Sequence, residues 1–504
     1  MKLKGIFRKA LGLLIVFAFM FAAVFPAFAG AIESFSKAIE LEKNASYFKA
    51  VKMYERAARE AGREKNDIIE VKSNFRIKQI EKIIISYPYD KKQAKKALAK
   101  ALPKIDKKER DSWFETNKIN DYILIDGKPY YQQTFIANIL FRDDAVYHKV
   151  NRSKSRAFFG SLYDIIYRPA DAGFKPDAAI PNINPVDFLG TQTLKVPRAK
   201  LPKTGLLQMW FPMPIMSSAQ SDVRFISFAP QKYLKALPKA DADISLAYFE
   251  VPLEQLKEDL NIEIKFMFKR YEQRFIIDPA SCGAYDTESA LYKEYTRSNK
   301  NTAVTAEIKA KAEQIAAGEK NPYLAAKKIY NYVVENIKYS FMPHLALGVL
   351  EMPESVFVHE LGYGDCGAQS MYFAALCRSI GIPAKSSGGY QLVPGYAGPH
   401  FWAEFYLPNY GWVPVDTSIA QTVDRSYGAT IEQKKRFKQY FFGCMDPYRY
   451  NIQRETDAAL TPISEDPIFL PLAVQMPVIN LKGSKKNMEF TLLEYWKQNI
   501  EPAL

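Results

Sequence analysis

The fold is decided by residues 362–370, which read Gly-Tyr-Gly-Asp-Cys-Gly-Ala-Gln-Ser and lead from a loop into a helix. Asp365 is a residue type that caps helix N-termini, and apolar residues follow it at helical spacing. Gly381 and Pro383 predict the end of this helix. We therefore expect Cys366 on the first helical turn, where free N–H groups and the helix dipole favour an anion. The sequence thus predicts a nucleophilic cysteine with a lowered thiol pKa.

A thiolate nucleophile needs a proton partner, and His400 is the best placed of the four histidines in the chain. A strand is predicted from His400 to residue 406, followed by a turn at 408–411 and a second strand over 412–416. Asp416 ends that second strand, so we expect it beside His400 at the open end of a hairpin. There its carboxylate can orient one imidazole nitrogen while the other faces the cysteine.

These segments resemble the transglutaminase-like (papain-like) superfamily. The nucleophile segment comprises residues 364–366 and 376–384, and the His and Asp segments, 400–404 and 411–416, follow in the same order. Residues 442–449 are similar to a tail motif of the bacterial branch, in which Asn is usual at the position of Cys444. The resemblance covers roughly residues 200–455 in outline and 360–450 with high specificity. It implies a catalytic triad of Cys366, His400 and Asp416 on a papain-like α+β core.

The resemblance further implies acyl-enzyme chemistry on the amide bonds of a peptide or protein substrate. Bacterial members act as peptidases or amidases, which we expect first, or as protein cross-linkers. Water would give hydrolysis and an amine would give transamidation, and the triad does not decide between them. The backbone N–H of Cys366 would meet the oxyanion; the second donor stays open, with Tyr339 and Tyr363 as candidates. The alternative is a catalytically silent binding or assembly protein of the cell envelope.

Two further segments precede this domain, which we place at residues 279–504. Residues 30–118 are helical in character and include one convincing tetratricopeptide-like match, formed by Tyr47, Ala50, Tyr54 and Ala57. A stable solenoid needs about three repeats, so a small α-hairpin domain is an equal alternative. Either form could bind a protein partner. Residues 119–278 read as short β-rich runs separated by turn residues, which favours a β-sandwich that supports the catalytic domain or orients its substrate.

Residues 1–29 read as a secretory signal peptide. A basic start and an apolar run over 10–24 are followed by Ala27-Phe28-Ala29, a pattern that signal peptidase accepts. The alternative is a permanent membrane anchor, for which the run is short. We expect an exported protein, periplasmic or secreted, with no stable membrane insertion after cleavage. The net charge of +14 could suit anionic partners, but export argues against nucleic acid.

The remaining polar residues offer less. The four histidines and four cysteines make no metal-ligand pattern, and no phosphate or dinucleotide motif is present, so we expect no metal and no cofactor. His359 could line the cleft, whereas His148 and His344 have no chemically active neighbours in the sequence. Cys377 is predicted to be a core thiol, and pairing of Cys282 with Cys444 stays open. Four cysteines are few for an exported chain of 504 residues, so disulfides do not carry the fold. Two residue types near the predicted triad have simpler expected roles: Trp402 and Trp412 wall the groove or pack the hairpin, and Glu404 forms a salt bridge or supports the site residues from behind.

Overall fold

The computed structural model describes residues 29–150, 179–394, 397–425, 429–466, 471–482 and 492–503, and the single residues 162, 166, 177 and 468. The predicted signal peptide lies outside these residues, apart from Ala29. The chain forms two compact units, one of residues 1–94 with 121–133 and the other of residues 95–120 with 134–504. Among the described residues, no helix is both long and apolar enough to cross a membrane.

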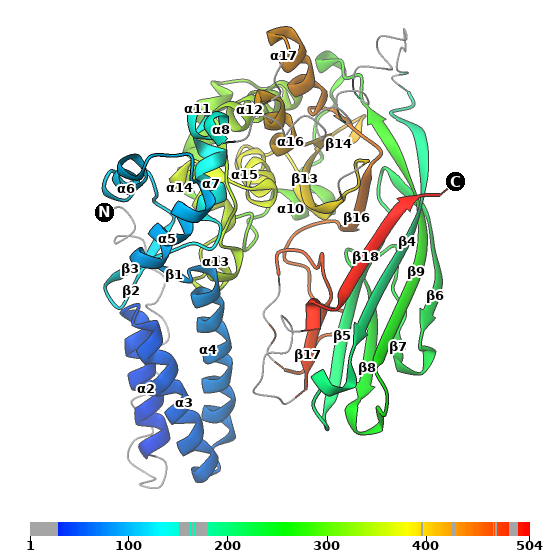
Figure 1. Ribbon diagram of the computed structural model, residues 1–504. Helices are drawn as coiled ribbons and strands as arrows, with labels where there is room; N and C mark the ends of the chain where they lie inside the picture. The colour runs from blue at the N-terminus through cyan, green and yellow to red at the C-terminus, as the bar shows by residue number, and fades with distance from the viewer. Residues whose placement is uncertain are drawn as a thin grey trace. The chain divides into compact units, whose positions relative to one another are not determined.

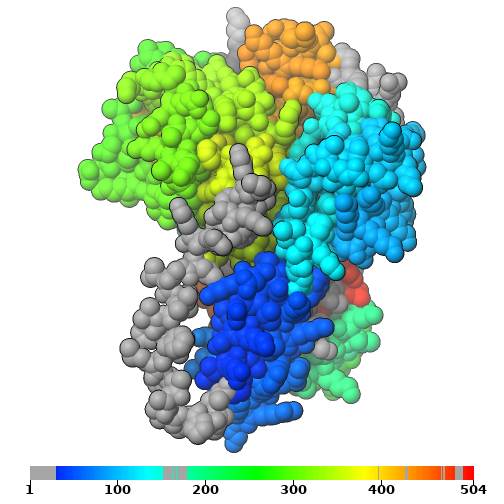
Figure 2. Space-filling model, turned by 90° about the vertical axis from the view of Figure 1, so that its left-hand side faces the viewer, coloured from blue at the N-terminus to red at the C-terminus, as the bar shows by residue number. Residues whose placement is uncertain are grey.

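The first unit is built on three consecutive helices, α2 (Ala29–Lys43), α3 (Tyr47–Glu64) and α4 (Asp67–Ser86). Tyr47, Ala50, Tyr54 and Ala57 are buried on α3. Small residues at this spacing let neighbouring helices approach closely. Strands β1 (Tyr89–Asp90), β2 (Tyr122–Ile125) and β3 (Lys128–Tyr131) form a small sheet in the order β1-β3-β2. The blue helices of this unit form one continuous surface in Figure 2.

The second unit contains a β-sandwich. One sheet has the order β15-β9-β4-β18, with β6 also paired to β9, and the other has the order β17-β5-β8-β7. On β9, alternate residues are buried, as the alternating pattern of residues 261–268 predicts. The core between the sheets is apolar and includes Phe188, Phe211, Phe249 and Phe266. The strands are β4 (Asn182–Val196), β5 (Leu206–Met213), β6 (Gln220–Ala229), β7 (Leu234–Ala236), β8 (Ser245–Pro252), β9 (Leu260–Arg274), β15 (Cys444–Met445), β17 (Val478–Leu481) and β18 (Trp496–Pro502).

The sandwich draws its strands from two distant parts of the sequence. Strands β17 and β18 come after the predicted site residues, yet β17 pairs with β5 and β18 pairs with β4 (Figure 1). The region predicted as β-rich also contains helices α7 (Phe135–Arg142) and α8 (Asp144–Val150). The chain thus leaves the sandwich after β9, builds the helical part, and returns to complete the sheets.

The chain between β9 and β17 forms the α+β core that the sequence predicts. An antiparallel sheet in the order β14-β13-β12-β16 packs against helix α15 (Cys366–Ser379), shown in yellow in Figure 1. Almost every residue of α15 is buried, so this helix is enclosed on all sides. The sheet consists of β12 (Ala384–Gln391), β13 (Gly398–Leu407), β14 (Gly411–Val415) and β16 (Arg449–Gln453).

The second unit also contains further helices and a pair of two-residue strands. The helices are α5 (Lys91–Ala101), α6 (Lys107–Glu115), α10 (Ala290–Thr296), α11 (Ala306–Ala316), α12 (Pro322–Asn336), α13 (His344–Val349), α14 (Glu354–Leu361), α16 (Thr417–Thr422) and α17 (Ile431–Tyr440), and α5 begins in the first unit. Strands β10 (Lys338–Tyr339) and β11 (Tyr363–Gly364) pair in parallel just before α15.

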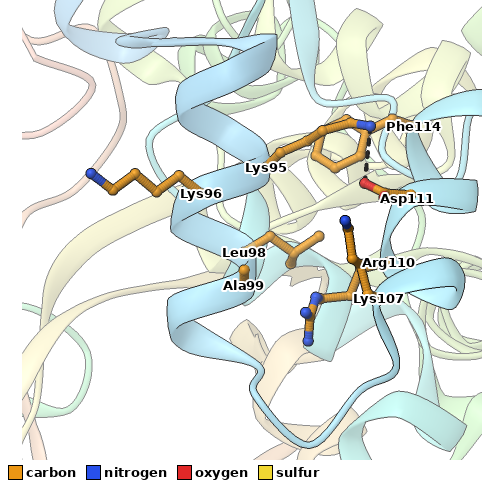
Figure 3. Close-up of a pocket in the computed structure, with 8 residues that line it drawn as sticks. All are labelled: Lys95, Lys96, Leu98, Ala99, Lys107, Arg110, Asp111 and Phe114. Atoms are coloured by element: carbon orange, nitrogen blue, oxygen red, sulfur yellow. Dashed lines mark ion pairs between the residues drawn. The ribbon is translucent and has the colours of Figure 1, made fainter.

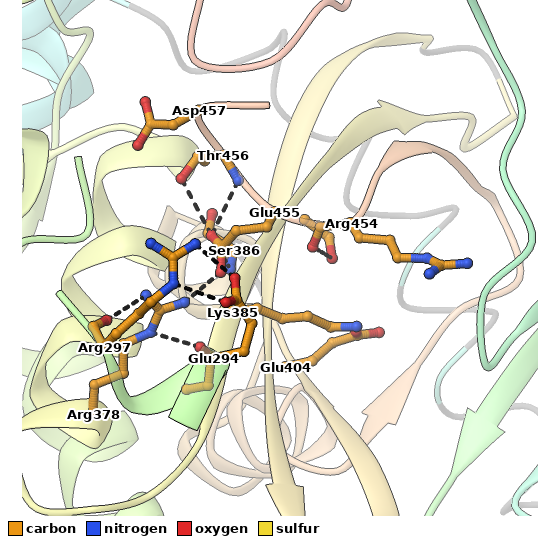
Figure 4. A network of polar contacts seen from close by, with 12 residues as sticks. Glu294, Arg297, Arg378, Lys385, Ser386, Glu404, Arg454, Glu455, Thr456 and Asp457 are labelled. Atoms are coloured by element: carbon orange, nitrogen blue, oxygen red, sulfur yellow. Dashed lines mark hydrogen bonds and ion pairs between the residues drawn. The ribbon is translucent and has the colours of Figure 1, made fainter. Parts of the chain in front are cut away.

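A buried ion pair anchors the far end of α15. Arg378 is fully buried and contacts Glu455, which follows β16 (Figure 4). The same guanidinium donates to the carbonyl oxygen of Ala384 at 2.8 Å and to that of Arg297 at 3.0 Å. Helix α15 is therefore tied at its C-terminus to β12 and to the segment after β16, which holds its N-terminus in a defined place against the sheet.

Candidate active site

Cys366 begins helix α15, as predicted. The side chain of Asp365 caps the helix by accepting a hydrogen bond from the backbone N–H of Ala368 at 3.1 Å. Cys366 is partly exposed, and the backbone N–H of Phe401, the residue after His400, lies close enough to the thiol to favour its anion. The neighbouring Gly364 is required, because a Cβ there would lie 2.8 Å from Val358. The start of helix α15, with Cys366, thus lies against strand β13.

His400 and Asp416 meet as the predicted hairpin requires. Strands β13 and β14 pair antiparallel, and His400 Nε2 lies 2.7 Å from Asp416 Oδ2. The other carboxylate oxygen of Asp416 accepts from the backbone N–H of Ile419 at 3.0 Å. Both side chains are buried. The carboxylate therefore has a fixed orientation and holds Nε2 of the imidazole.

A third residue, for which no role was predicted, contacts the same carboxylate. Arg449 Nη1 lies 2.6 Å from Asp416 Oδ2, and Arg449 Nη2 lies 2.7 Å from Asp446 Oδ2. The side chains of all three residues are almost completely buried. Arg449 ends the tail motif at 442–449, and that motif was the available signal. These contacts form a chain of polar side chains that runs from His400 through Asp416 and Arg449 to Asp446.

The electrostatics of Cys366 differ from the prediction. Burial, followed by the negative charge of Asp365, raises the pKa of Cys366 above its usual range, and Asp416 adds to the rise. The predicted lowering of the thiol pKa is therefore wrong, because tertiary packing outweighs the helix N-terminus. For Asp416, burial favours the neutral acid, but His400 and Arg449 outweigh burial and lower the pKa. The resting site holds a protonated thiol and an ionised aspartate.

Comparison with known proteins bears on this geometry. Residues 309–417, which include all three predicted triad residues, match the Transglutaminase-like superfamily. They form a transglutaminase-like domain. An uncharacterized protein of Haemophilus influenzae is 24% identical over 325 residues, which cover 57% of this chain and 84% of that protein.

Solved structures of low sequence identity also align with the chain. A candidate cysteine protease from Cytophaga hutchinsonii is 12% identical, with a TM-score of 0.39, covering 64% of this chain and 92% of that one. The periplasmic domain of TgpA from Pseudomonas aeruginosa is 13% identical, with a TM-score of 0.25, covering 50% of this chain and 92% of that domain.

Two arginines lie close to the ring of Trp402, which follows His400 by two residues. Trp402 is fully buried, and the guanidinium groups of Arg270 and Arg449 each lie 5.7 Å from its ring centroid. Trp402 therefore packs the hairpin and does not form an open wall of the groove. Glu404 forms the predicted salt bridge, with its carboxylate 2.8 Å from Lys385 Nζ.

The other histidines differ from expectation. His344 does have chemically active neighbours: its Nδ1 lies 2.8 Å from Glu354 Oε1 and its Nε2 lies 2.6 Å from Asp365 Oδ2. His359 contacts the hydroxyl of Tyr372 at 3.0 Å, in the interior of the domain. Sequence spacing could not reveal the His344 contacts, because its partners lie 10 and 21 residues away in separate elements.

The other cysteines and the two candidate oxyanion donors can also be located in the structure. Cys377 is buried in the core, and all four cysteines are free thiols. Tyr339 and Tyr363, the two candidate oxyanion donors, lie on the paired strands β10 and β11. No group of three His, Cys, Asp or Glu side chains that could hold a metal occurs among the described residues.

A cleft in the second unit lies apart from Cys366, His400 and Asp416. Its volume is about 430 Å³, and helices α5 and α6 contribute most of its lining, including Lys96, Lys107, Arg110 and Phe114 (Figure 3). Lys95 in this cleft is paired with Asp111 at 2.9 Å. None of the predicted site residues lines it, so this cleft is separate from the candidate active site.

Proposed function

We propose that this chain is an exported cysteine-dependent acyl-transfer enzyme that acts on amide bonds of peptides or proteins through Cys366, His400 and Asp416. The observation that carries the proposal is the ordered approach of three groups. The thiol of Cys366 contacts the backbone of β13 beside His400, and His400 is held by the ionised Asp416. A nucleophile, a base and a group that orients the base are the parts that covalent acyl transfer needs.

The protonated state of Cys366 shapes the first step of the proposed mechanism. Nε2 of His400 is occupied by Asp416, so Nδ1 is the nitrogen left to act on the thiol. In this scheme Nδ1 takes the Sγ proton while the sulfur attacks the amide carbonyl carbon. The C–N bond then breaks, the departing amine receives the proton from His400, and a thioester remains on Cys366. Asp416 stabilises the imidazolium formed between these steps.

Two parts of this scheme depend on the groove. The backbone N–H of Cys366, at the start of α15, is the proposed first oxyanion donor, and Tyr339 or Tyr363 is the proposed second. The thioester is then resolved by water, which releases an acid, or by an amine, which forms a new amide. We propose hydrolysis as the main outcome, as in a peptidase or amidase, with cross-linking as its variant.

Export to the periplasm or beyond is part of the proposal and rests on residues 1–29. Mass spectrometry of the protein expressed in a bacterial host tests it directly. The expected mature N-terminus is Gly30. A chain that keeps its first residues and stays in the cytoplasm would contradict export.

The catalytic proposal is tested with an acyl-electrophile probe and a peptide library. Wild type is expected to label at Cys366 and to cleave a subset of peptides, and Cys366→Ala is expected to do neither. Cys282→Ala removes another partly exposed thiol and serves as the matched control, with wild-type turnover expected. Folded wild-type protein that leaves Cys366 unlabelled would favour the catalytically silent binding protein. Product that forms only with an added primary amine would replace hydrolysis by transamidation.

A further inference from the structure

His344 is the first residue of helix α13 and contacts Asp365, the residue before Cys366. His344 bridges two carboxylates, with Nδ1 2.8 Å from Glu354 Oε1 and Nε2 2.6 Å from Asp365 Oδ2. Asp365 is the residue that immediately precedes Cys366 and caps its helix. The three side chains thus link the starts of α13, α14 and α15. None of them belongs to the triad.

The two carboxylates that act on Cys366 share one feature. Asp365 and Asp416 both disfavour a negative charge on the sulfur, and Asp365 has the larger effect. Asp416 is offset by Arg449, which contacts it at 2.6 Å. Asp365 is offset only by His344 among the described ion pairs. Each carboxylate beside the thiol is therefore paired with a basic side chain, Asp416 with Arg449 and Asp365 with His344.

We propose that His344 is a positioning residue for the nucleophile: as a cation it holds the Asp365 carboxylate and offsets that charge beside Cys366. Asp365 uses its two oxygens for different partners. Oδ1 accepts the helix-capping hydrogen bond from Ala368, and Oδ2 contacts His344. Without the cation, the helix cap would remain but its full negative charge would face the sulfur. The inference rests on the proposed role of Cys366 as nucleophile.

The surroundings of His344 favour its charged form. Burial disfavours the cation, but Asp365 and Glu354 outweigh burial and raise the pKa of His344 well above its usual range. Glu354 is almost completely buried, and burial raises its own pKa. Asp457 is the other carboxylate that acts on Glu354, and Asp457 itself accepts from the backbone N–H of Asn301 at 3.0 Å. His344 is thus faced by carboxylates and by no lysine or arginine among the described contacts.

The test is the pH dependence of Cys366 alkylation by iodoacetamide in the full chain, followed by mass spectrometry to separate Cys366 from Cys282 and Cys444. His344→Gln is expected to move the alkylation profile to higher pH by roughly half a unit to one unit, because the offsetting cation is lost. Asp365→Asn keeps an oxygen for the helix cap and is expected to move the profile to lower pH. The double variant is expected to match Asp365→Asn, since the charge to be offset is gone.

Two controls separate charge from structure. His359→Gln removes another histidine that contacts α15, and its profile is expected to match wild type. His344→Lys restores a cation, so its alkylation profile is expected to return most of the way to that of wild type. An unchanged profile for His344→Gln, or an equal shift in His359→Gln, would overturn the inference. If His344→Gln does not fold, the test rests on Asp365→Asn. An alkylation profile of Asp365→Asn that matches wild type would then overturn the inference.

Alkylation needs no substrate, so this result is independent of turnover. A chain that shows the expected shifts but cleaves no peptide would contradict the proposed function and leave the inference standing. A chain that cleaves peptides but shows no shift would contradict only the inference.

Discussion

Arg449 lies with its whole side chain buried between Asp416 and Asp446, at 2.6 and 2.7 Å. Replacing it by methionine keeps much of the apolar volume but leaves two buried carboxylates without their cation. We expect Arg449→Met to lower the free energy of unfolding by about 3–5 kcal/mol, measured by urea denaturation. Turnover is also expected to fall, because Asp416 loses one of the two groups that keep it ionised.

The matched control for Arg449→Met is Arg297→Met. Arg297 pairs with Glu294 at 2.6 Å, but both side chains are about half exposed. Such a pair contributes at most about 1 kcal/mol. A loss of stability as large in Arg297→Met as in Arg449→Met would show that burial of the ion pair is not the cause.

The two histidines that contact the start and middle of α15 are predicted to respond to pH with opposite signs. The pKa of His344 is raised in the folded state, so its stabilising contribution is complete below the unfolded value of about 6.5 and is lost as the pH rises towards the folded value. For His359, burial lowers the pKa, so its contribution is present above about 6.5 and is lost on acidification.

Urea denaturation at about pH 6 and pH 9 measures this difference. His344→Gln is expected to cost about 1 kcal/mol at the lower pH, a value reduced by the one-third exposure of the side chain, and less at the higher pH. His359→Gln is expected to cost more at the higher pH. Equal losses at both pH values for His344→Gln would contradict a charged imidazole.

At the scale of elements, strand β12 depends on a close approach to β16. Gly389 pairs with His400 on one side and with Asn451 on the other, where the register shifts. A Cβ on Gly389 would lie 1.9 Å from the carbonyl oxygen of Tyr450. We expect Gly389→Ala to separate these strands, to lower stability by several kcal/mol and to abolish turnover, with thermal unfolding and peptide cleavage as the measurements.

Gly62→Ala is the comparison for that change. Gly62 lies within helix α3, where a Cβ would have only an ordinary contact of 3.4 Å with Glu70. Alanine in a helix is favoured over glycine by about 0.5–1 kcal/mol, so a small gain in stability is expected. Wild-type behaviour of Gly389→Ala would show that β12 and β16 can move apart without cost.

The sequence predicted those parts of the site that residues close together in the chain form, and it did not predict the contacts between distant residues. Helix α15, its cap and the His400–Asp416 hairpin follow from residues close together in the chain, and the structure has all three. The partners of Asp365 and Asp416 could not be read in the same way, because His344 is 21 residues from Asp365 and Arg449 is 33 residues from Asp416.

The prediction of the Cys366 thiol pKa failed for the same reason. A helix start is visible in the sequence, whereas burial and the approach of a second carboxylate arise only when β13, paired with β14, packs against α15. The direction of the shift was therefore wrong even though the position of Cys366 was right. Strand β16 pairs with β12 and begins at Arg449, the last residue of the tail motif, and that motif did not predict a strand in this sheet.

At the scale of the whole second unit, the tail motif connects the sandwich to Asp416. Strand β15 pairs Cys444 with Arg274 of β9, and Asp446 and Arg449 follow at once. Removing the residues after 455 would take β17 from one sheet and β18 from the other. We expect this truncated chain to be insoluble or partly unfolded, as checked by expression and circular dichroism.

A fragment of residues 279–455 tests the same dependence from the other side. It keeps all triad residues and Arg449 but loses β9, the partner of β15. We expect it to lack turnover and a cooperative unfolding transition. A stable, active fragment would show that the sandwich is dispensable for the site.

The return of the chain to the sandwich also has a consequence for its synthesis. Trp496 on β18 contacts Gln192 on β4 across 304 residues. At roughly 5–20 residues per second, a ribosome needs on the order of 15–60 s to make that interval. Throughout this time one edge of β4 has no partner, and an open strand edge invites pairing with another chain. The newborn polypeptide is therefore expected to expose this edge of β4 until its last strand is made.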